Sequence, residues 1–121
     1  MINWNNMDTL ASYAALKAVE PVKLAAVMAG ENGAERVKKY TVPMGCGMDF
    51  NFGARPVNDE ILSIMADFAK EQQLVEKFAE LYNGAVINTG EKRRVLHHMC
   101  RGQLGEAVIA DGVDKREFYV G

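Results

Sequence analysis

The sequence is poor in cysteine and has no long apolar run. Its 121 residues include 2 cysteines, Cys46 and Cys100, and these form no Cys-x-x-Cys pair. Nothing in their spacing requires a disulfide, so reduced thiols in the cytoplasm are the simpler expectation. No apolar stretch approaches the ~20 residues of a membrane-spanning helix, and no apolar core of a secretory signal is recognisable. We therefore expect a cytoplasmic protein without a membrane partner.

An excess of basic residues is also missing. Lysine and arginine total 14 against 16 aspartate and glutamate residues, which gives a formal net charge of −2. Proteins dedicated to nucleic acids usually carry clear positive charge, so no nucleic-acid partner is expected. The glycines Gly45 and Gly47 are not followed by Gly-Lys-Ser/Thr, which excludes a phosphate-binding P-loop at this place.

What is present is the composition of an ordinary globular protein. Apolar residues make up 49% of the sequence and charged residues 25%, which are usual values for a soluble domain. A length of 121 residues fits one domain, or part of one, that is long enough to bury a core.

The N-terminal half predicts two helices followed by two strands. Asp8 is placed to cap a helix with apolar positions from Leu10 to Leu16, and a second short helix is expected from Pro21. Gly30 and Gly33 are expected to end that second helix. The alternation of residue types then predicts short strands over 40–44 and 49–52, joined by a glycine-rich turn.

The central region predicts two amphipathic helices that pair in an antiparallel manner. Asn58 is a good N-cap, and apolar residues follow it with helical spacing as far as Ala69. The pattern resumes over 74–82 after Gln72-Gln73 and stops at Asn83-Gly84. A short helix over 95–101 and a short strand over 107–110 complete the prediction. The expected core is Leu62, Met65, Phe68, Val75, Phe78, Leu81, Val95 and Leu96.

The residues that could bind a ligand or take part in a reaction gather between Lys92 and Arg101. His97 and Cys100 are three positions apart, so a helix would bring two metal ligands together, and no other cluster supplies the rest. A cysteine–histidine nucleophilic pair lacks an activating context in the sequence. The basic residues from Lys92 to Arg101 could bind an anion or nucleic acid, although salt bridges to acidic residues, or solvated charges, are the better explanation. The residues alone therefore identify no active site.

The same region resembles a known enzyme family. The residues that carry the likeness are Gly84-x-x-Ile87-Asn88-x-x-Glu91-x-Arg93-x-Val95-Leu96-His97-x-x-x-Arg101. This pattern is similar to the N-terminal signature of the glucose-6-phosphate isomerase family. An ordered likeness extends over roughly residues 36–114, from Arg36-x-x-x-Tyr40 to Val108-Ile109-Ala110-Asp111-Gly112-x-Asp114.

The sequence departs from the family pattern at several positions. Gly90 stands where the family has threonine, and Arg94 stands where it has alanine. His98-Met99-Cys100 replaces a smoother apolar stretch, and no lysine follows the strand that contains Asp49. These differences point to a divergent member that lacks the threonine hydroxyl.

The resemblance implies an α/β fold: a mainly helical N-terminal segment, residues 1–121, with a few short strands, taken from a larger α/β sugar-isomerase sandwich. The parent enzyme would interconvert glucose 6-phosphate and fructose 6-phosphate through an enediol, as a homodimer and without a metal or organic cofactor. In that family the phosphate loop Gly-Ile-Gly-Gly-Ser and the glutamate base lie later in the chain, and neither motif occurs here.

The resemblance therefore implies that no catalytic, substrate-binding or metal-binding residue lies in these 121 residues. The segment alone is expected to be inactive, and the natural protein is expected to continue beyond Gly121. Within the segment, Glu91, Arg93 and His97 are expected to support the substrate site without touching the substrate.

Overall fold

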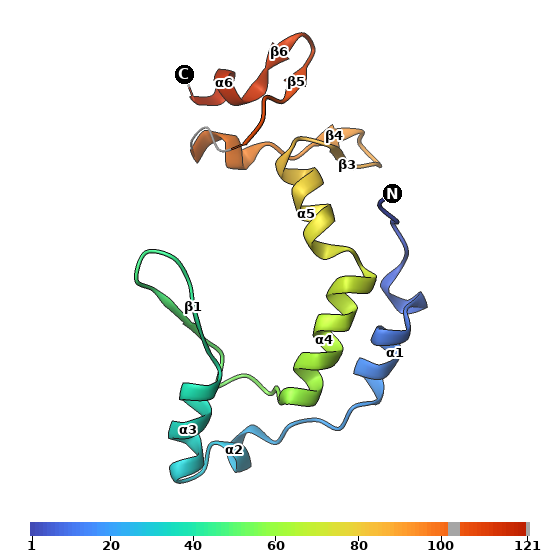
Figure 1. Ribbon diagram of the computed structural model, residues 1–121. Coiled ribbons are helices and arrows are strands. Elements are labelled where there is room, and N and C mark those ends of the chain that lie inside the picture. Colours follow the sequence, from blue (N-terminus) through green and yellow to red (C-terminus); the bar gives the residue numbers. More distant parts are fainter. Residues whose placement is uncertain (102–104, 121) are drawn as a thin grey trace. The chain divides into compact units, whose positions relative to one another are not determined.

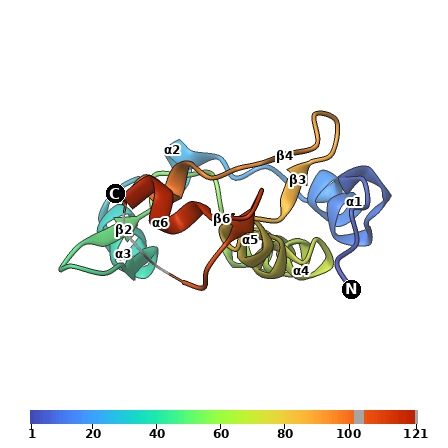
Figure 2. The same cartoon turned by 90° about the horizontal axis from the view of Figure 1, so that it is seen from above.

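The computed structural model describes residues 1–101 and 105–120, which form two compact units. One unit comprises residues 6–68, and the other combines residues 1–5 with residues 69–121. Figure 1 shows the elements in chain order, and Figure 2 shows them from above. Helices and short antiparallel strand pairs alternate in both units, so the predicted mixed α/β class is confirmed. Whether the segment is one domain of a longer enzyme stays a prediction.

The unit of residues 6–68 contains helices and one hairpin. Its elements are the 3-10 helix η1 (Met7–Thr9), α1 (Ala11–Ala18), α2 (Leu24–Val27), α3 (Glu31–Lys39), β1 (Thr41–Pro43), β2 (Asp49–Asn51) and most of α4 (Asp59–Glu71). The strands pair antiparallel, with Val42 opposite Phe50, as the alternation predicted. Cys46 and Gly47 in the connection have φ angles of 59° and 71°. The glycine takes such angles without strain.

Three predictions for the N-terminal half are wrong. Asp8 does not cap α1, because it lies inside η1 and Leu10 takes the N-cap position. The helix α2 begins at Leu24 rather than Pro21. Gly30, with φ at 59°, begins the helix α3 instead of ending a helix. Apolar periodicity did not predict helix α3, because this helix contains few apolar residues to mark a face.

The helix α4 follows the prediction closely. The side-chain Oδ1 of Asn58 accepts a hydrogen bond of 2.8 Å from the backbone N–H of Ile61, which is the expected N-cap bond. Asp59 and Glu60 occupy the first turn, where the helix dipole favours negative charge.

In its described residues, the second unit contains the α-helices α5 and α6, one 3-10 helix and four short strands. Its elements are α5 (Leu74–Tyr82), β3 (Val86–Asn88), β4 (Arg93–Arg94), the 3-10 helix η2 (His97–Arg101), β5 (Ile109–Ala110), β6 (Val113–Asp114) and α6 (Lys115–Val120). Helix α6 lies against η2 (Figures 1 and 2). The prediction that α4 and α5 pair in an antiparallel manner stays a prediction, since they belong mostly to different units.

The end of α5 forms the predicted left-handed exit. The N–H of Gly84 bonds to Leu81 O at 3.0 Å, and the N–H of Ala85 bonds to Glu80 O at 2.9 Å. These two bonds define a Schellman motif. Gly84 has a φ of 77°, and a Cβ there would lie 2.3 Å from Val108 Cγ1. Glycine is therefore required at this position for two independent reasons.

The predicted helix over 95–101 is partly wrong. Arg93 and Arg94 form the strand β4 against β3, and only His97–Arg101 are helical, in the tighter 3-10 form. The predicted strand over 107–110 is confirmed at Ile109 and Ala110, and it pairs with β6. Sequence reasoning missed the β3–β4 pair and α6, because neither shows clear apolar periodicity.

The buried apolar core is small. Its residues are Tyr40 and Ile61 in one unit, and Met99 and Val108 in the other. Three predicted core residues are instead exposed: Met65 by 46%, Val75 by 78% and Phe78 by 64%. The other predicted core residues, Leu62, Phe68, Leu81, Val95 and Leu96, are half-buried. The prediction of this core is therefore wrong: none of the eight residues is buried, because little in the described residues covers these apolar faces.

Candidate functional site

The turn between β3 and β4 places Glu91 and Arg93 side by side. Asn88 Oδ1 accepts a hydrogen bond of 3.1 Å from the N–H of Glu91, and Asn88 Nδ2 donates one of 3.1 Å to Glu91 Oε2. Arg93 Nη1 lies 4.0 Å from the same Glu91 oxygen. The two side chains are 77% and 63% exposed, so the ion pair adds little stability. Asn88 therefore does more than Arg93 to orient Glu91.

His97, the third predicted support residue, lies in a different surrounding. It begins η2 and lines a hollow of about 190 Å³ together with Arg94, Leu96, Cys100 and Tyr119. The structure thus brings Glu91 and Arg93 together, whereas His97 faces a hollow whose lining includes neither of them. Arg94 is fixed nearby, because its Nη1 donates a hydrogen bond to Gly84 O.

A second hollow in the same unit is lined by four basic side chains and one acidic side chain. Its charged lining residues are Lys92, Arg93, Arg94, Asp111 and Lys115, and its volume is about 440 Å³. Asp111 lies 3.8 Å from the Lys115 ammonium and offsets one of the four cations. The surplus positive charge favours anions in this hollow.

The same unit contains a buried arginine that the sequence analysis did not identify. Arg116 is 2% exposed, and its guanidinium donates to Glu106 O at 2.5 Å and to Tyr82 O at 2.7 Å. It also lies 4.9 Å from the centre of the Tyr82 ring, which stacks on His98 at 4.6 Å. Within residues 1–101 and 105–120, Arg116 Nη1 has no hydrogen-bond partner. No sequence signal marks this residue, since a burial this deep is unusual for arginine.

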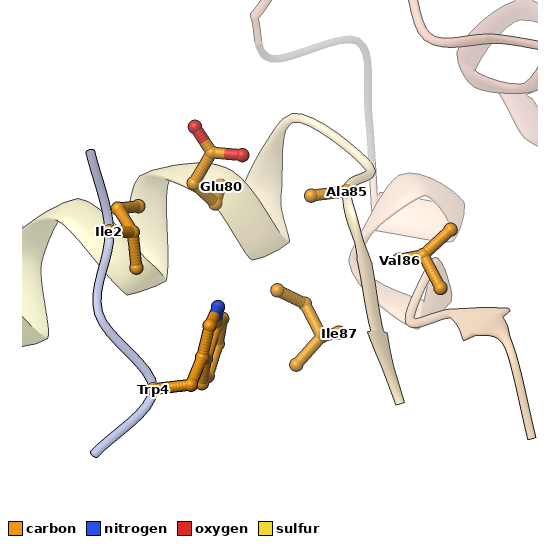
Figure 3. A pocket seen from close by; sticks show the side chains of 6 residues that line it. All are labelled: Ile2, Trp4, Glu80, Ala85, Val86 and Ile87. Atoms are coloured by element: carbon orange, nitrogen blue, oxygen red, sulfur yellow. The ribbon is translucent and has the colours of Figure 1, made fainter. Parts of the chain in front are cut away.

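Ile2 and Trp4, near the start of the chain, line a mostly apolar hollow of about 260 Å³ (Figure 3). Its lining residues are Ile2, Trp4, Glu80, Ala85, Val86 and Ile87. Gln73 fixes the N-terminal segment. Its Oε1 accepts a hydrogen bond from the N–H of Asn3 at 2.7 Å, and its Nε2 donates one to Met1 O at 3.3 Å. The ammonium of Lys77 lies 5.0 Å from the centre of the Trp4 ring. The hollow lacks the convergent polar groups that a substrate site needs.

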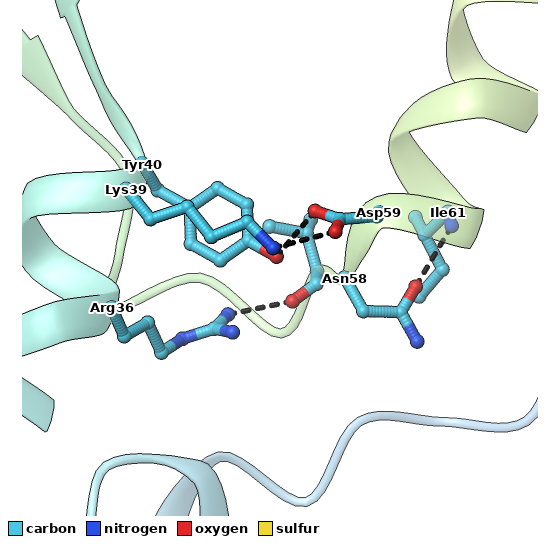
Figure 4. A network of polar contacts seen from close by, with 7 residues as sticks. Arg36, Lys39, Tyr40, Asn58, Asp59 and Ile61 are labelled. Carbon is cyan, nitrogen blue, oxygen red and sulfur yellow. Dashed lines mark hydrogen bonds and ion pairs between the residues drawn. The ribbon is translucent and has the colours of Figure 1, made fainter. Parts of the chain in front are cut away.

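The unit of residues 6–68 contains a polar network around Asp59 (Figure 4). Tyr40 OH donates to Asp59 Oδ1 at 2.9 Å, and Lys39 Nζ donates to Asp59 Oδ2 at 2.5 Å. The hydrogen bond from Lys39, followed by the one from Tyr40, holds the pKa of Asp59 below its ordinary value. The hydrogen bond to Asp59 in turn raises the pKa of Lys39.

The role of this network is structural. Arg36 donates to the carbonyls of Gly53, Arg55 and Val57, and so fixes the segment that leads into α4. Arg36 and Tyr40 are the pair on which part of the family likeness rests, and the Arg36 guanidinium lies 4.6 Å from the Tyr40 ring centre.

The side chains that commonly bind metals do not form a cluster in the described residues. Across residues 1–101 and 105–120, no three histidine, cysteine, aspartate or glutamate side chains gather closely enough to bind a metal ion. Cys46 and Cys100 are both free and exposed. In the described part of the chain, no helix is both long and apolar enough to cross a membrane.

Similarity to known proteins was found over most of the chain. The chain is 44% identical over 124 residues to glucose-6-phosphate isomerase of Treponema denticola. The match covers 98% of this chain and 24% of that protein. The glucose-6-phosphate isomerase of Treponema pallidum (strain Nichols) is 47% identical, with 98% and 22% covered. That of Borreliella afzelii is 35% identical, again with 98% and 22% covered. The chain thus spans less than a quarter of the length of these relatives.

The family comparison agrees with these relatives. Residues 51–117 match the family described as phosphoglucose isomerase. The matched range contains the Glu91–Arg93 turn, His97 and the buried Arg116, so it includes the whole region from which the resemblance was first drawn. By this match over more than half of its length, the chain belongs to the phosphoglucose isomerase family.

Proposed function

We propose that this chain is the N-terminal part of an enzyme that interconverts glucose 6-phosphate and fructose 6-phosphate by proton transfer through an enediol. The observation that carries the proposal is the family match over residues 51–117, together with 44% identity to a protein named glucose-6-phosphate isomerase over 98% of this chain. The sugar phosphate is therefore the proposed substrate.

The chain itself contributes structure rather than catalytic groups. It corresponds to 22–24% of the length of its treponemal relatives, and its sequence lacks the Gly-Ile-Gly-Gly-Ser phosphate loop. In the described part of the chain, the carboxyl of Asp59 is exposed, and hydrogen bonds from Lys39 and Tyr40 lower its pKa. A proton-transferring base instead needs a pKa close to the working pH.

Glu91, Arg93 and His97 are proposed to support the substrate site without contacting the substrate. The two hydrogen bonds between Asn88 and Glu91 support this role, because they orient the carboxylate without help from the rest of the protein. The rest of the protein would approach the exposed Glu91 and Arg93 side chains, and such an approach would desolvate their ion pair and strengthen it.

The complete enzyme is proposed to act as a cytoplasmic homodimer, with no metal or organic cofactor and no nucleic-acid or membrane partner. The net charge of −2 supports the absence of a nucleic-acid partner. The alternative of a small anion- or nucleic-acid-binding module, built on Lys92–Arg101, receives no support from the comparisons.

The test is an isomerase assay on two purified proteins, namely residues 1–121 and the complete polypeptide that the gene encodes. Formation of glucose 6-phosphate from fructose 6-phosphate is followed by coupling it to NADP reduction. We expect activity from the complete polypeptide and none from the 121-residue chain. A complete polypeptide that folds but shows no isomerase activity would refute the proposal.

The support role is tested in the same assay with Glu91→Gln, and with Lys92→Met as the neighbouring control. We expect kcat to fall about tenfold for Glu91→Gln, with KM nearly unchanged, since the lost contact positions other groups. Equal effects of the two substitutions would show that Glu91 has no such role.

A further inference from the structure

The β1–β2 hairpin has one wholly apolar face. Val42 is paired with Phe50, and the N–H of Met44 bonds to Met48 O at 2.8 Å one step further toward the tip. Side chains alternate along a strand, so Val42, Met44, Met48 and Phe50 project from the same side. We call these four residues the hairpin face. Its side chains are 47%, 52%, 58% and 54% exposed.

The apolar surface continues from the core. Phe52 donates its N–H to Tyr40 O at 2.9 Å, and Phe50 stacks on Phe52 at 5.9 Å, which in turn contacts Tyr40 at 5.4 Å. Tyr40 is buried, whereas Phe50 is 54% exposed. The face is thus covered at its base and open toward the tip.

The opposite face of the hairpin is polar and already occupied. Asn51 Nδ2 donates to Val37 O and to Thr41 Oγ1, both at 2.6 Å, and Thr41 Oγ1 donates to Val37 O at 2.5 Å. These bonds tie the polar face to the end of α3. The arrangement is the reverse of a usual antiparallel sheet, whose apolar face packs on the core while its polar face is in water.

We propose that the hairpin face is the docking surface for the part of the same polypeptide that lies beyond these 121 residues. This inference rests on the proposed function, which makes the chain less than a quarter of a longer enzyme. A two-stranded hairpin with two unpaired edges and an open apolar face is marginal alone and needs a covering layer.

The size of the face favours this occupant over a second copy of the chain. Four half-exposed side chains of about 200 Å² each offer roughly 400 Å² per molecule, so a symmetric contact would bury about 800 Å², below the ~1,200 Å² of a stable dimer. A tethered segment of the same polypeptide needs less area, because the tether supplies a high effective concentration.

The test is hydroxyl-radical footprinting, which measures solvent access to methionine and phenylalanine side chains. It compares the 121-residue chain with the complete polypeptide. We expect Met44, Met48 and Phe50 to oxidise about tenfold more slowly in the complete polypeptide, because close packing excludes the radical. Equal oxidation rates in the two proteins would overturn the proposal.

Two substitutions on the same strand provide a matched pair in the complete polypeptide. Phe50→Asp places a charge on the hairpin face and should restore oxidation of Met44 and Met48. Asp49→Lys alters the opposite face and should leave the protection intact. If Phe50→Asp prevents folding, the footprint of the natural sequence still decides the matter.

Two further outcomes would assign the face to another occupant and refute the proposal. Protection that is lost when the complete protein is diluted to monomers would indicate a subunit interface. Protection that appears in the 121-residue chain as its concentration rises would indicate a second copy. The footprint requires no isomerase activity, so protection in an inactive protein would support the docking surface while the proposed function falls.

Discussion

At the scale of single residues, the most consequential side chain is Arg116. It is buried to 2% exposure, and it joins Tyr82 O at the end of α5 to Glu106 O beyond η2. Burying a guanidinium is costly unless its donors are satisfied, and here two of the bonds go to backbone carbonyls. Its backbone N–H is also fixed, by a 3.0 Å bond to Asp114 Oδ1.

Arg116→Met should therefore destabilise the chain strongly. The change leaves two buried carbonyl oxygens without their charged donors, and we expect the free energy of unfolding to fall by about 2–4 kcal/mol. Urea unfolding of the 121-residue chain measures this. The control Arg93→Met removes a side chain that is 77% exposed and should change stability by less than about 0.5 kcal/mol. Similar losses in both variants would contradict the assignment.

Asp59 makes stability depend on pH at the acidic end. Its pKa is lowered from 3.8 in the folded chain, first by the hydrogen bond from Lys39 and then by that from Tyr40. The carboxylate thus contributes stability that is present above the ordinary value and is lost as the pH falls through the lowered folded pKa. The Asp59→Asn variant should accordingly lose stability at neutral pH and should approach the natural sequence as the solution is acidified.

Unfolding measurements between about pH 6 and pH 2 test this expectation, because that window spans the ordinary pKa range of aspartate. NMR titration of the Asp59 carboxyl tests its pKa directly. The partner gives the opposite sign. Lys39 has its pKa raised from 10.5, mainly by Asp59, so its contribution is present below that value and is lost as the pH rises through the raised one. A difference between variant and natural sequence that stays constant between about pH 6 and pH 2 would refute the statement about Asp59, and one that stays constant above the ordinary lysine pKa would refute the statement about Lys39.

At the scale of elements, local signals gave the correct result where the element is held by its own residues. The N-cap at Asn58, the break at Gln73 and the exit at Gly84 were all readable from residue type. The hairpin over 41–51 was readable from alternation and glycine. The strand β4 and the 3-10 helix η2 were misread, because the chain around them has no clear period.

Gly84→Ala tests the junction between α5 and β3. The residue has a φ of 77°, and a Cβ would lie 2.3 Å from Val108 Cγ1. We expect a loss of about 2–4 kcal/mol in unfolding free energy, from backbone strain and overpacking combined. The double variant Gly84→Ala with Val108→Ala should relieve the overpacking but not the strain. Full tolerance of Gly84→Ala would show that the junction can rearrange.

At the scale of the whole molecule, the chain has more apolar surface than it can bury. Val75 and Phe78 on α5 are 78% and 64% exposed, whereas Met99 beside α6 is fully buried. Large exposed apolar patches on a soluble protein mark surfaces that another protein segment covers. The chain spans less than a quarter of the length of its named relatives, and the proposed function would place the remainder of a longer enzyme against such surfaces.

Truncation on an exposed and on a buried site should therefore have different effects. In the 121-residue chain, Phe78→Ala should lower the free energy of unfolding by less than about 1 kcal/mol, because the ring is mostly in water. Met99→Ala should cost about 2–5 kcal/mol, because it leaves a cavity. Thermal or urea unfolding distinguishes the two, and a large effect of Phe78→Ala would mean that α5 is covered within the chain.

The sequence by itself determined the family, the mixed α/β class and the elements that local hydrogen bonds and periodicity define. These properties depend on neighbours within a few positions, which the order of residues specifies directly. Only the tertiary structure decided which apolar faces are buried, how Arg116 joins the end of α5 to α6, and that Glu91 and Arg93 lie apart from the hollow lined by His97. Burial depends on segments far apart in the chain, and for the hairpin face we infer a covering segment that lies outside these 121 residues.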